Sequence, residues 1–494
     1  MHILVIDMGT SSLKLLLFDA QGRIVLQARR RHSPVYSGDS AEMDPCILER
    51  NLWDALEEIA AACKEQGILP GAVSVTAQRS SVIPVDQSGN VLHHALMWQD
   101  KRSEKICESY ASRCVELYAA TGMKPSPVLS ASKIRWLKAE KPSIYEQAHK
   151  LIGFHEYLLY LVTGQFLTDT TIAGRSGLMD VRTLQWSPEL LAAYGVDGTK
   201  LCAIVPVGSI CGTTCGRFRE IFHLSDGIPV VSAGGDQQCA ALGMGCVTPG
   251  ATSINTGTGA YVLTLAEQPL FDDTRTAVCN PAAIPHHWVL EGSVFAGGSA
   301  IEWMNRTFFG GAHQSYPYED FDRAAESAPP GANGLLFFSS LCMGEGPPES
   351  GMGLLHVGLG HTKADFARAL MEGLAFDIAA CVSNTERVSG QAVPSPLRCG
   401  GGLSENPLFT RLLADILGKS ITVSACSNVT ALGAWISAAV ASGMKRDYGT
   451  AYEEASAQAD MHTVAPDPER HAIYMEIQKK RENAQQKKGH DQHA

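Results

Sequence analysis

The sequence predicts an α/β protein built from two similar domains. Its 494 residues exceed what one hydrophobic core usually supports, so we expect two domains. A strand, a turn rich in glycine and hydroxyl residues, and a second strand are predicted at residues 3–18, and the same pattern returns at 251–264. Because this pattern opens both halves, we expect a duplicated fold with a ligand between the copies. The expected domains span residues 1–245 and 246–445, followed by an extension at 446–494.

The first turn, Asp7-Met-Gly-Thr-Ser-Ser12, lies between the predicted strands 3–6 and 13–18, and a third strand begins at Ile24. This antiparallel meander has no GxxxxGK[ST] pattern, so a Walker-type phosphate loop is not the model. Asp7 can hold Mg²⁺, directly or through water. A plain hairpin with hydroxyl-capped turns is the alternative for one such turn alone. The backbone N–H groups and hydroxyls that would hold phosphate oxygens belong to Gly9, Thr10, Ser11 and Ser12.

Asp236 stands where a predicted strand gives way to a helix. Residues 228–231 form an apolar run, Gly234 and Gly235 allow a sharp turn, and residues 237–242 begin a helix of small residues. Backbone N–H groups at such a junction favour the charged form of an acid. An ionised carboxylate close to a ligand can accept a proton from a hydroxyl, although helix capping is an equally simple role.

Polar and aromatic residues gather at the ends of the strands that follow the first hairpin. Planar donors and carboxylates pair with hydroxyl groups, and an indole face covers C–H surface, so this cluster fits a polyhydroxylated ligand. Solvated charges beside a buried tryptophan are the alternative. The cluster comprises Gln78, Arg79, Trp98, Asp100 and Arg102.

Two glycine-rich turns are predicted in the second half of the chain. Asn255-Thr-Gly-Thr-Gly259 repeats the character of the first turn. Gly400-Gly-Gly402 lies between a strand that begins at Leu397 and a helix over 408–417. Three consecutive glycines let a flat ring such as adenine lie against bare backbone. A tight turn that packs the helix on the sheet is the alternative.

The remaining elements follow from periodicity and from chain-breaking residues. The polar stretch 168–177 and the stretch 341–353, which is rich in glycine and proline, are expected to be loops. From about residue 466 the chain is charged and rich in glutamine, and we expect its final dozen residues to be disordered. Helices are predicted over 47–66, 130–141, 145–162 (one or two), 365–381, 408–417 and 431–441.

Composition and charge narrow the function classes. The net charge of −11 argues against a nucleic-acid or anionic-membrane partner. The 14 cysteines lack paired CxxC spacing, so neither a zinc site nor a disulfide framework is expected. Asp7 and Lys14 interrupt the N-terminal apolar run before a signal-peptide core forms, and no uncharged apolar stretch reaches membrane-spanning length. We therefore expect a cytoplasmic enzyme.

The three turns, their order and the acidic strand-to-helix stretch resemble the FGGY carbohydrate kinases over nearly the whole chain. Ser130-Ala-Ser-Lys-Ile-Arg-Trp-Leu resembles most of the first family signature, and Asp365-Phe-Ala-Arg-Ala-Leu-Met-Glu372 resembles the second half of the other. Ala139 and His356 depart from the residue types usual at their positions. The resemblance implies two duplicated ribonuclease-H-like domains, the fold shared by actin, Hsp70 and hexokinase, with a cleft between them.

The resemblance also implies an ATP-dependent kinase that phosphorylates a hydroxyl of a small sugar or polyol, with a homodimer as the family default. Asp236 would be the general base, and Mg²⁺ would bridge phosphate oxygens beside Asp7 and Asp236. The substrate would be bound in the first domain by Gln78, Arg79, Trp98, Asp100, Asp236 and Gln237. ATP would be bound by Gly9, Thr10, Ser11, Ser12, Lys14, Thr256, Gly257, Thr258, Gly259, Gly401, Gly402 and Asn406.

The signals for the substrate point in two directions. Gln78-Arg79 and Met97-Trp-Gln-Asp-Lys-Arg102 resemble glycerol kinases, but Ser80 stands where those enzymes carry glutamate. The segment Leu341-Cys-Met-Gly-Glu-Gly-Pro is closer to xylulokinases, although their Met-His after the glutamine is absent. A ketose or sugar-alcohol kinase of the xylulokinase type is the leading prediction, and glycerol kinase is the alternative. A non-catalytic, sugar-responsive nucleotide-binding protein of the actin/Hsp70 type is the alternative of another class, which the intact Asp236 disfavours.

Overall fold

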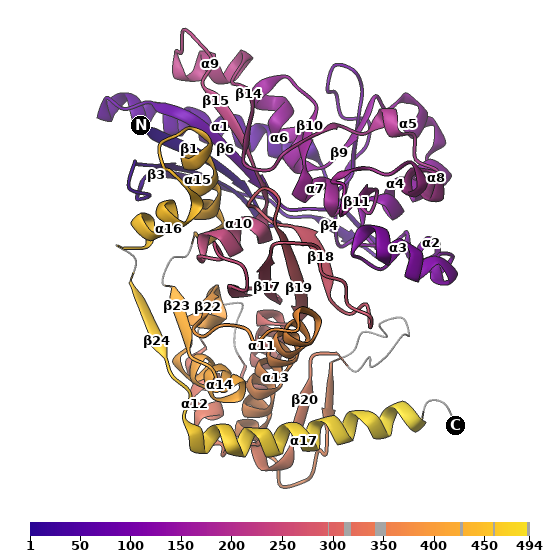
Figure 1. The fold of residues 1–494 in the computed structure, drawn as a ribbon, viewed down its shortest axis with the longest axis vertical. Helices are drawn as coiled ribbons and strands as arrows, with labels where there is room; N and C mark the ends of the chain where they lie inside the picture. The colour runs from indigo at the N-terminus through magenta and orange to yellow at the C-terminus, as the bar shows by residue number, and fades with distance from the viewer. Residues whose placement is uncertain (295, 311–317, 341–351, 425–427, 458–459, 492–494) are drawn as a thin grey trace. The chain divides into compact units, whose positions relative to one another are not determined.

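The computed structural model describes residues 1–294, 296–310, 318–340, 352–424, 428–457 and 460–491, which form two compact units (Figure 1). The first unit comprises Met1–Pro249, Leu265–Leu290 and Asn428–Gln458, and the second comprises Gly250–Thr264, Glu291–Ser427 and Ala459–Ala494. The chain therefore passes between the units several times, whereas the expected boundaries near 245 and 445 assume continuous domains.

The first unit is built on a six-stranded sheet in the order β14-β15-β6-β1-β2-β3. The strands β1, β2 and β3 are antiparallel neighbours, which confirms the predicted meander. β6 and β15 run parallel in the centre, and β14 is an antiparallel edge strand. The six strands are β1 (His2–Met8), β2 (Ser12–Phe18), β3 (Ile24–Arg31), β6 (Pro70–Ala77), β14 (Ser209–Thr213) and β15 (Pro229–Gly235).

Helices cover this sheet, and most strand side chains are therefore buried. Leu4 and Ile6 of β1 share a core with α1 and α6, while the helix α15 packs against β1, β6 and β15. The predicted helices at 47–66, 130–141, 145–162 and 431–441 are confirmed. The helices of the unit are α1 (Pro45–Gln66), α2 (Glu104–Glu108), α3 (Cys114–Thr121), α4 (Ser130–Glu140), α5 (Pro142–Gln147), α6 (Phe154–Thr163), α7 (Thr170–Gly174), α8 (Pro188–Tyr194), α9 (Gly216–Phe222), α10 (Asp236–Gly243), α15 (Val429–Ala441) and α16 (Tyr448–Ser456).

The smaller strands of the unit join its loops in short sheets. They are β4 (Val35–Ser37), β5 (Ser40–Met43), β7 (Ile83–Val85), β8 (Ala95–Leu96), β9 (Lys150–Ile152), β10 (Leu167–Asp169), β11 (Met179–Asp180), β12 (Gln185–Trp186) and β13 (Ala203–Val205). A further strand, β18 (Val278–Pro281), belongs instead to a seven-stranded sheet.

The segment Asn428–Gln458 belongs to the first unit because α15 crosses α10 at two glycines. A Cβ atom on Gly243 would lie 1.9 Å from the carbonyl oxygen of Val429, and one on Gly433 would lie 1.9 Å from that of Cys239. Only bare backbone allows this approach. Sequence analysis placed residues 428–445 in the second domain, but this contact holds them in the first unit.

The predicted loop over residues 168–177 is wrong. The structure forms β10 and then α7 there, with Asp169 as the N-cap. The Asp169 carboxylate accepts hydrogen bonds from the backbone N–H groups of Thr171 and Ile172, which satisfies donors that a helix start leaves open. The polar composition of this stretch therefore reflects a cap and not a loop.

The second unit contains most of a seven-stranded sheet in the order β18-β19-β17-β16-β22-β23-β24. β16 and β17 form the predicted second hairpin, and β16 pairs in parallel with β22. The predicted helices at 365–381 and 408–417 are confirmed. The elements are β16 (Thr252–Thr256), β17 (Ala260–Ala266), β19 (Trp288–Val294), α11 (Gly298–Phe308), α12 (Glu319–Ser327), β20 (Leu336–Phe338), β21 (Gly353–Leu355), α13 (Lys363–Ser389), β22 (Leu397–Gly400), α14 (Pro407–Leu417), β23 (Ile421–Ser424), β24 (Met461–Val464) and α17 (Pro468–Asp491).

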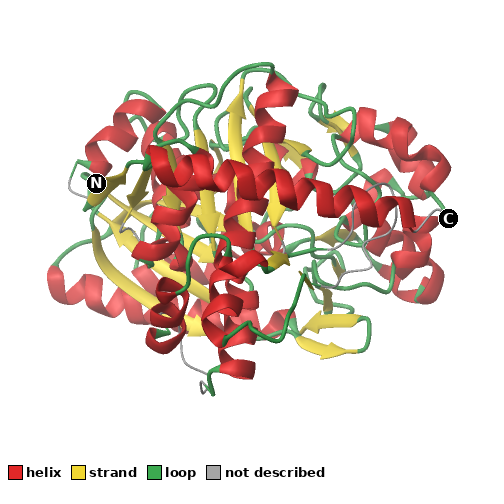
Figure 2. Cartoon of the chain, turned by 90° about the horizontal axis from the view of Figure 1, so that it is seen from below, coloured by secondary structure: helices red, strands yellow, loops and turns green. Residues whose placement is uncertain are grey.

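α17 continues to Asp491 and is the long helix that ends near the C-terminal label (Figure 2), whereas residues 492–494 lie outside the described residues, so the expected disorder of the last dozen residues stays a prediction. Two side chains tie α17 to α13. The Tyr474 hydroxyl donates to Glu372 at 3.0 Å, and the Arg481 guanidinium pairs with Asp377. These polar anchors are buried although the segment carries few apolar residues. Of the predicted loop at 341–353, residues 341–351 lie outside the described residues.

Candidate active site

Asp236 is the first residue of α10, directly after β15, as predicted. Its Oδ1 accepts a hydrogen bond from the N–H of Gln237 at 2.8 Å, and the Nε of Arg79 lies 3.8 Å from the same oxygen. The side chain of Arg79 is 7% exposed and that of Asp236 is 23% exposed. Asp236 is therefore the solvent-reaching member of a buried pair, as a group that must meet a substrate should be.

Two glycines make this arrangement possible. Gly234 has φ of 107°, a conformation that side chains rarely adopt. A Cβ atom on Gly235 would lie 2.6 Å from Cδ of Arg79. The turn therefore brings backbone close to Arg79 and points the next residue, Asp236, away from the strand.

Three predicted site residues meet in one hydrogen-bonded chain. The indole N–H of Trp98 donates to Oγ1 of Thr10 at 3.2 Å, and the Thr10 hydroxyl donates to Oε1 of Gln78 at 3.2 Å. The N–H of Gln78 also donates to the carbonyl of Met8 at 2.8 Å. The first glycine turn and the predicted substrate residues are thus parts of the same site.

Asp100 is 1% exposed, and its carboxylate is hydrogen-bonded both to β5 and to its neighbour Arg102. Its carboxylate accepts from the N–H of Ala41 at 2.9 Å and from the Arg102 guanidinium at 2.7 Å. Arg102 also lies over the ring of Trp136, 4.2 Å from the ring centre. Asp100 therefore ties its segment to Ala41 and Arg102, and direct contact of Asp100 with substrate stays a prediction.

Ser80 has the left-handed backbone angle φ of 69°, which is uncommon outside glycine and clusters at functional sites. Among the described residues, the buried hydroxyls of Ser80 and Ser81 have no hydrogen-bond partner. Both line a cavity of about 30 Å³ together with Gln78, Ser130 and Glu156. A backbone angle cannot be inferred from residue type, so the sequence identified Ser80 only by its departure from the glycerol kinase pattern.

Asp7 is a buried carboxylate on β1, directly opposite Lys14 of β2. Burial raises the pKa of Asp7 to about 6, the Lys14 ammonium opposes this shift, and the nearby Asp236 carboxylate adds to it. Among the described residues no group of three or more His, Cys, Asp or Glu side chains could hold a metal ion. Two neighbouring carboxylates nevertheless fit Mg²⁺, which is commonly bound by one or two carboxylates together with substrate phosphates and water.

His32 supports the first glycine turn and was missed by the sequence analysis. Its Nε2 lies 2.9 Å from the carbonyl oxygen of Gly9, and its N–H donates to the carbonyl of Ser11 at 3.1 Å. Because a carbonyl oxygen only accepts, Nε2 of His32 is the donor to Gly9. Burial lowers the pKa of His32, and this hydrogen bond opposes the shift. His32 follows the end of β3, and only the β2–β3 pairing brings it to the turn, so no local pattern could reveal it.

In the second unit, the two predicted glycine turns are in direct contact. The hydroxyl of Thr256 donates to the carbonyl of Gly400 at 2.9 Å and accepts from the N–H of Ser404 at 3.1 Å. Gly401 has φ of 93°, and a Cβ atom on it would lie 2.3 Å from the carbonyl oxygen of Thr256. Gly401 therefore has a steric reason to be glycine, independent of any ligand.

A third glycine segment, at the start of α11, contacts the first of these turns, Asn255–Gly259. The N–H of Gly298 donates to the carbonyl of Gly257 at 2.9 Å, and the N–H of Ser299 donates to that of Thr258 at 3.2 Å. A Cβ atom on Gly297 would lie 2.8 Å from the carbonyl carbon of Gly259. The sequence showed glycines leading into a helix here but assigned them no role.

Asn406 caps α14, since its Oδ1 accepts from the N–H of Phe409 at 3.0 Å. This structural role is compatible with a further contact, and its predicted contact with the nucleotide stays a prediction.

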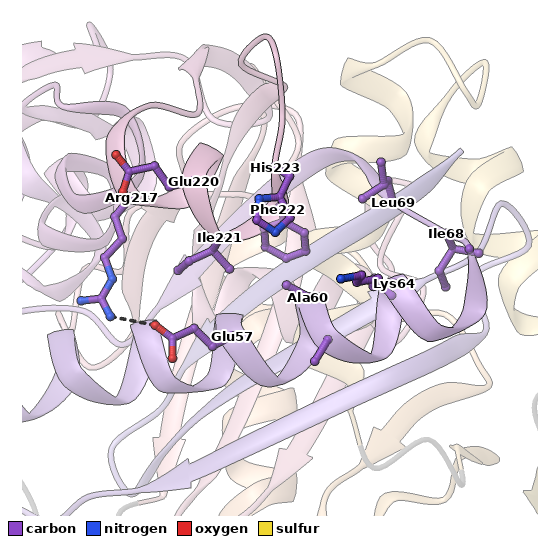
Figure 3. Close-up of a pocket in the computed structure, with 13 residues that line it drawn as sticks. Glu57, Ala60, Lys64, Ile68, Leu69, Arg217, Glu220, Ile221, Phe222 and His223 are labelled. Atoms are coloured by element: carbon purple, nitrogen blue, oxygen red, sulfur yellow. Dashed lines mark hydrogen bonds and ion pairs between the residues drawn. The ribbon is translucent and has the colours of Figure 1, made fainter.

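A separate cavity of about 840 Å³ lies between α1 and α9 (Figure 3). An ion pair of Arg217 with Glu57, 2.9 Å long, closes one side, and Lys64 and His223 also line it. None of the predicted site residues lines this cavity, so its size does not make it the active site.

None of the described helices is long and apolar enough to cross a membrane.

Comparison with known proteins identifies the family. Residues 2–243 match the model for the N-terminal domain of the FGGY family of carbohydrate kinases, and residues 252–442 match its C-terminal domain. A glycerol kinase of Thermus brockianus is 31% identical over 453 residues, which cover 88% of each chain. A gluconokinase of Bacillus licheniformis is 27% identical over 461 residues, covering 90% of this chain and 88% of that one.

Solved structures share the fold. A ligand-bound xylulose kinase from Lactobacillus acidophilus superposes with a TM-score of 0.87 at 24% identity, covering 96% of both chains. A Plasmodium falciparum glycerol kinase with ADP gives 0.87 at 23% identity, covering 98% of both. These matches confirm the predicted two-domain ribonuclease-H-like fold, and the family supports an enzyme over a non-catalytic binding protein. The chain is an ATP-dependent carbohydrate kinase that belongs to the FGGY family.

Proposed function

We propose that this kinase transfers the γ-phosphoryl group of ATP to a hydroxyl of a ketose or sugar alcohol, with Asp236 as the general base. The observation that carries this proposal is the placement of Asp236, at the start of α10 and beside Arg79. A carboxylate at a helix N-terminus is stabilised as the anion, the form that accepts a proton.

In the proposed reaction, Asp236 accepts the proton of the substrate hydroxyl, whose oxygen forms a bond to the γ-phosphorus as the bond to the β-phosphate oxygen breaks. ADP leaves with that electron pair. Arg79 holds the carboxylate of Asp236 in place from one side. Gln78 and Trp98 present a hydrogen-bonding group and an indole face to the sugar. Positioning and electrostatics supply most of the rate in such transfers.

The first unit would also hold Mg²⁺, through Asp7 and Asp236. The bound ion would neutralise charge that develops on the phosphate oxygens. Lys14, which lies opposite Asp7 and donates to Oδ1 of Asn428 at 3.1 Å, would add a positive charge for the phosphates. The turn at Gly9, Thr10, Ser11 and Ser12 would offer N–H groups and hydroxyls to them.

The nucleotide would lie on the second unit, against the glycine turns. Gly257 and Thr258 are exposed next to the start of α11, which suits phosphate, whereas Gly259 is buried. Beside Gly402 nothing lies within 4 Å of where a Cβ atom would be, so a flat ring could rest there. Asn406 would contact the adenosine from the start of α14.

Substrate choice rests on Ser80. Glycerol kinases carry a glutamate there, whose carboxylate would grip two hydroxyls, and this chain has a short hydroxyl beside a small cavity. Because serine is smaller than glutamate, this position favours a substrate larger than glycerol, such as a ketose or sugar alcohol. Glycerol kinase remains the second candidate, because the relative at 31% identity bears that name.

The test is an ADP-release assay with Mg²⁺ and ATP over glycerol, erythritol, xylitol, D-xylulose, L-xylulose, D-ribulose, gluconate and rhamnulose. Turnover of a ketose or sugar alcohol well above glycerol supports the proposal. Preference for glycerol establishes the second candidate, and preference for gluconate replaces both. We further propose a cytoplasmic homodimer, by family default, which size-exclusion chromatography with light scattering and cell fractionation would test.

A further inference from the structure

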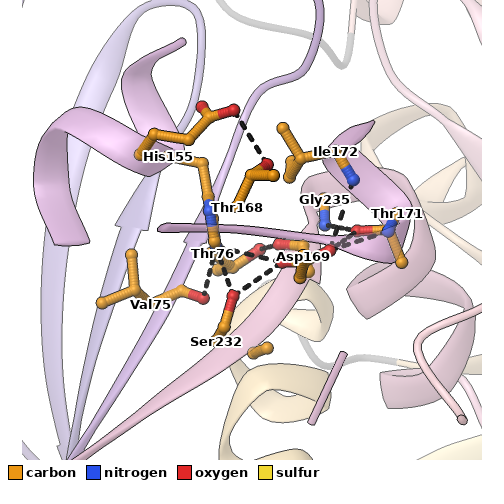
Figure 4. Close-up of polar contacts among 12 residues, drawn as sticks. Val75, Thr76, His155, Thr168, Asp169, Thr171, Ile172, Ser232 and Gly235 are labelled. Carbon is orange, nitrogen blue, oxygen red and sulfur yellow. Dashed lines mark hydrogen bonds and ion pairs between the residues drawn. The ribbon is translucent and has the colours of Figure 1, made fainter. Parts of the chain in front are cut away.

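A buried polar network centred on Asp169 includes Ser232 of β15 (Figure 4). Asp169, His155 and Ser232 are each 0% exposed, and they come from three different elements of the first unit. A buried carboxylate is costly unless hydrogen bonds satisfy it. The partners of Asp169 therefore indicate what the network is for.

One carboxylate oxygen of Asp169 is hydrogen-bonded to Thr171. Its Oδ1 accepts from the hydroxyl of Thr171 at 2.5 Å and from the N–H of Thr171 at 2.8 Å. Its Oδ2 accepts from the hydroxyl of Ser232 at 2.7 Å, with Nε2 of His155 at 3.5 Å. The carboxylate thus accepts the one hydrogen bond that the Thr171 hydroxyl can donate.

The hydroxyl of Thr171 then serves as an acceptor for the catalytic turn. Because its proton points to Asp169, its lone pairs face the N–H of Gly235, which donates to it at 2.9 Å. Gly235 directly precedes Asp236. The same Oγ1 would lie 2.9 Å from a Cβ atom on Gly234, so Thr171 packs closely against that residue as well.

A second threonine holds the other polar atom of the same peptide group. The hydroxyl of Thr76, on β6, donates to the carbonyl of Gly234 at 2.8 Å. The single peptide group between Gly234 and Gly235 is therefore held at both of its polar atoms by buried threonine hydroxyls, of which Thr76 acts as donor and Thr171 as acceptor. Both threonines are 0% exposed.

The network contains Ser, His and Asp, but it is not a hydrolase triad. In such a triad the histidine lies between the other two, and the serine is open to substrate. Here Ser232 donates directly to Asp169, and all three side chains are inaccessible to solvent.

We propose that Asp169, Thr171 and Thr76 are positioning residues that aim the carboxylate of Asp236 by holding the Gly234–Gly235 backbone. The inference rests on the proposed role of Asp236 as general base. These three residues, called the clamp below, act on the orientation of the Asp236 carboxylate and not on the nucleotide turns. Loss of the clamp should therefore lower kcat and leave the KM for ATP unchanged.

The decisive variants are Thr171→Val and Thr171→Ser. Valine keeps the shape and removes the acceptor for Gly235, whereas serine keeps the hydroxyl. We expect Thr171→Val to lower kcat roughly 10- to 100-fold with the KM for ATP within about twofold, and Thr171→Ser to restore kcat to within about threefold of wild type.

Thr168→Val is the matched control. Thr168 is also buried and lies on the adjoining strand, but its hydroxyl donates to Glu156 at 2.9 Å and does not contact the turn. It should lose comparable thermal stability yet keep its kcat. Equal kcat for Thr171→Val and Thr171→Ser would overturn the proposal, as would an equal loss of kcat in Thr168→Val, which would reveal a purely structural effect.

Two further measurements keep the test decisive. If Thr171→Val does not fold, Thr76→Val makes the same test from the carbonyl end of the Gly234–Gly235 peptide group, and unchanged kcat there overturns the proposal. Asp236→Asn separates the clamp from the proposed function. If that variant stays active, the base assignment and the clamp both fail; if it is inactive while Thr171→Val is fully active, only the clamp fails.

Discussion

Asp7 and Lys14 face each other across the first hairpin, paired in register between β1 and β2. Directly opposed residues in an antiparallel pair project to the same face, so the ammonium lies beside the carboxylate. It partly offsets the effect of burial, which raises the pKa of Asp7 to about 6. The hairpin thus places one negative and one positive group together, as a metal–phosphate site requires.

Replacing Asp7 should impair the use of Mg²⁺. We expect Asp7→Ala to need roughly tenfold more Mg²⁺ for half-maximal activity, because a carboxylate ligand is lost. Asp19→Ala is the control. It removes another acid of the same meander, which accepts hydrogen bonds from backbone N–H groups in the turn before β3, and it should keep the wild-type Mg²⁺ dependence. Activity of both variants is titrated against Mg²⁺ at saturating ATP. A wild-type curve for Asp7→Ala would exclude the metal role.

Asp236→Asn should abolish transfer while ATP binding is nearly retained. The amide keeps the shape but cannot accept the proton, and loss of a general base typically lowers the rate 10²- to 10⁴-fold. Single-turnover rates and ATP titration calorimetry measure the two properties separately. A comparable loss of both would favour a structural role for Asp236.

Gly401→Ala and Gly402→Ala should differ, although the residues are neighbours. At Gly401 the positive φ and the contact with Thr256 should destabilise the second unit by about 1 kcal/mol or more. At Gly402 the new methyl group meets nothing within 4 Å, so stability should stay unchanged while the KM for ATP rises. Thermal unfolding and ATP kinetics check both. Unchanged KM in a stable Gly402→Ala variant would remove the adenine from this turn.

Lys133 on α4 should make stability depend on pH. Burial lowers the pKa of Lys133 to about 7, although the charges of Asp100 and Cys107 oppose that shift. Lysine titrates near 10.4 in an unfolded chain, so the unfolded state binds more protons between about pH 7 and 10, and stability should rise with pH over that window.

Lys133→Met should flatten this dependence by up to about 1.4 kcal/mol per pH unit, because the titrating group is gone. The free energy of unfolding in urea at pH 7, 8 and 9 measures the slope. Lys138→Met, which removes a partly exposed lysine of the same helix, is the control. Parallel slopes for wild type and Lys133→Met would show that Lys133 does not titrate in the window.

The parts of the site that the sequence predicted are those written in local patterns. The strand–turn–strand hairpins and the junction at Asp236 each occupy fewer than about 20 consecutive residues, and their periodicity and glycines suffice to place them. His32 and Thr171 could not be predicted, because strand register and a helix cap bring them to the site from elsewhere in the chain. The cap by Asp169 also explains why a helix was mistaken for a loop.

The anchoring of α17 was missed for a related reason. By composition α17 is charged and hydrophilic. Its side chains Tyr474 and Arg481 are nevertheless buried and contact Glu372 and Asp377 of α13. Sparse anchors of this kind carry no periodic signal, so only the folded structure reveals them.

The crossing of α10 and α15 at Gly243 and Gly433 has a consequence for how the molecule is made. The helix that begins with Asp236 is covered by a helix encoded almost two hundred residues later, so the first unit cannot be complete when its own 249-residue segment leaves the ribosome. The second unit likewise waits for α17. The first unit is therefore completed only after α15 has been made and the second only after α17, and a fragment ending at Pro249 would expose the apolar face that α15 covers.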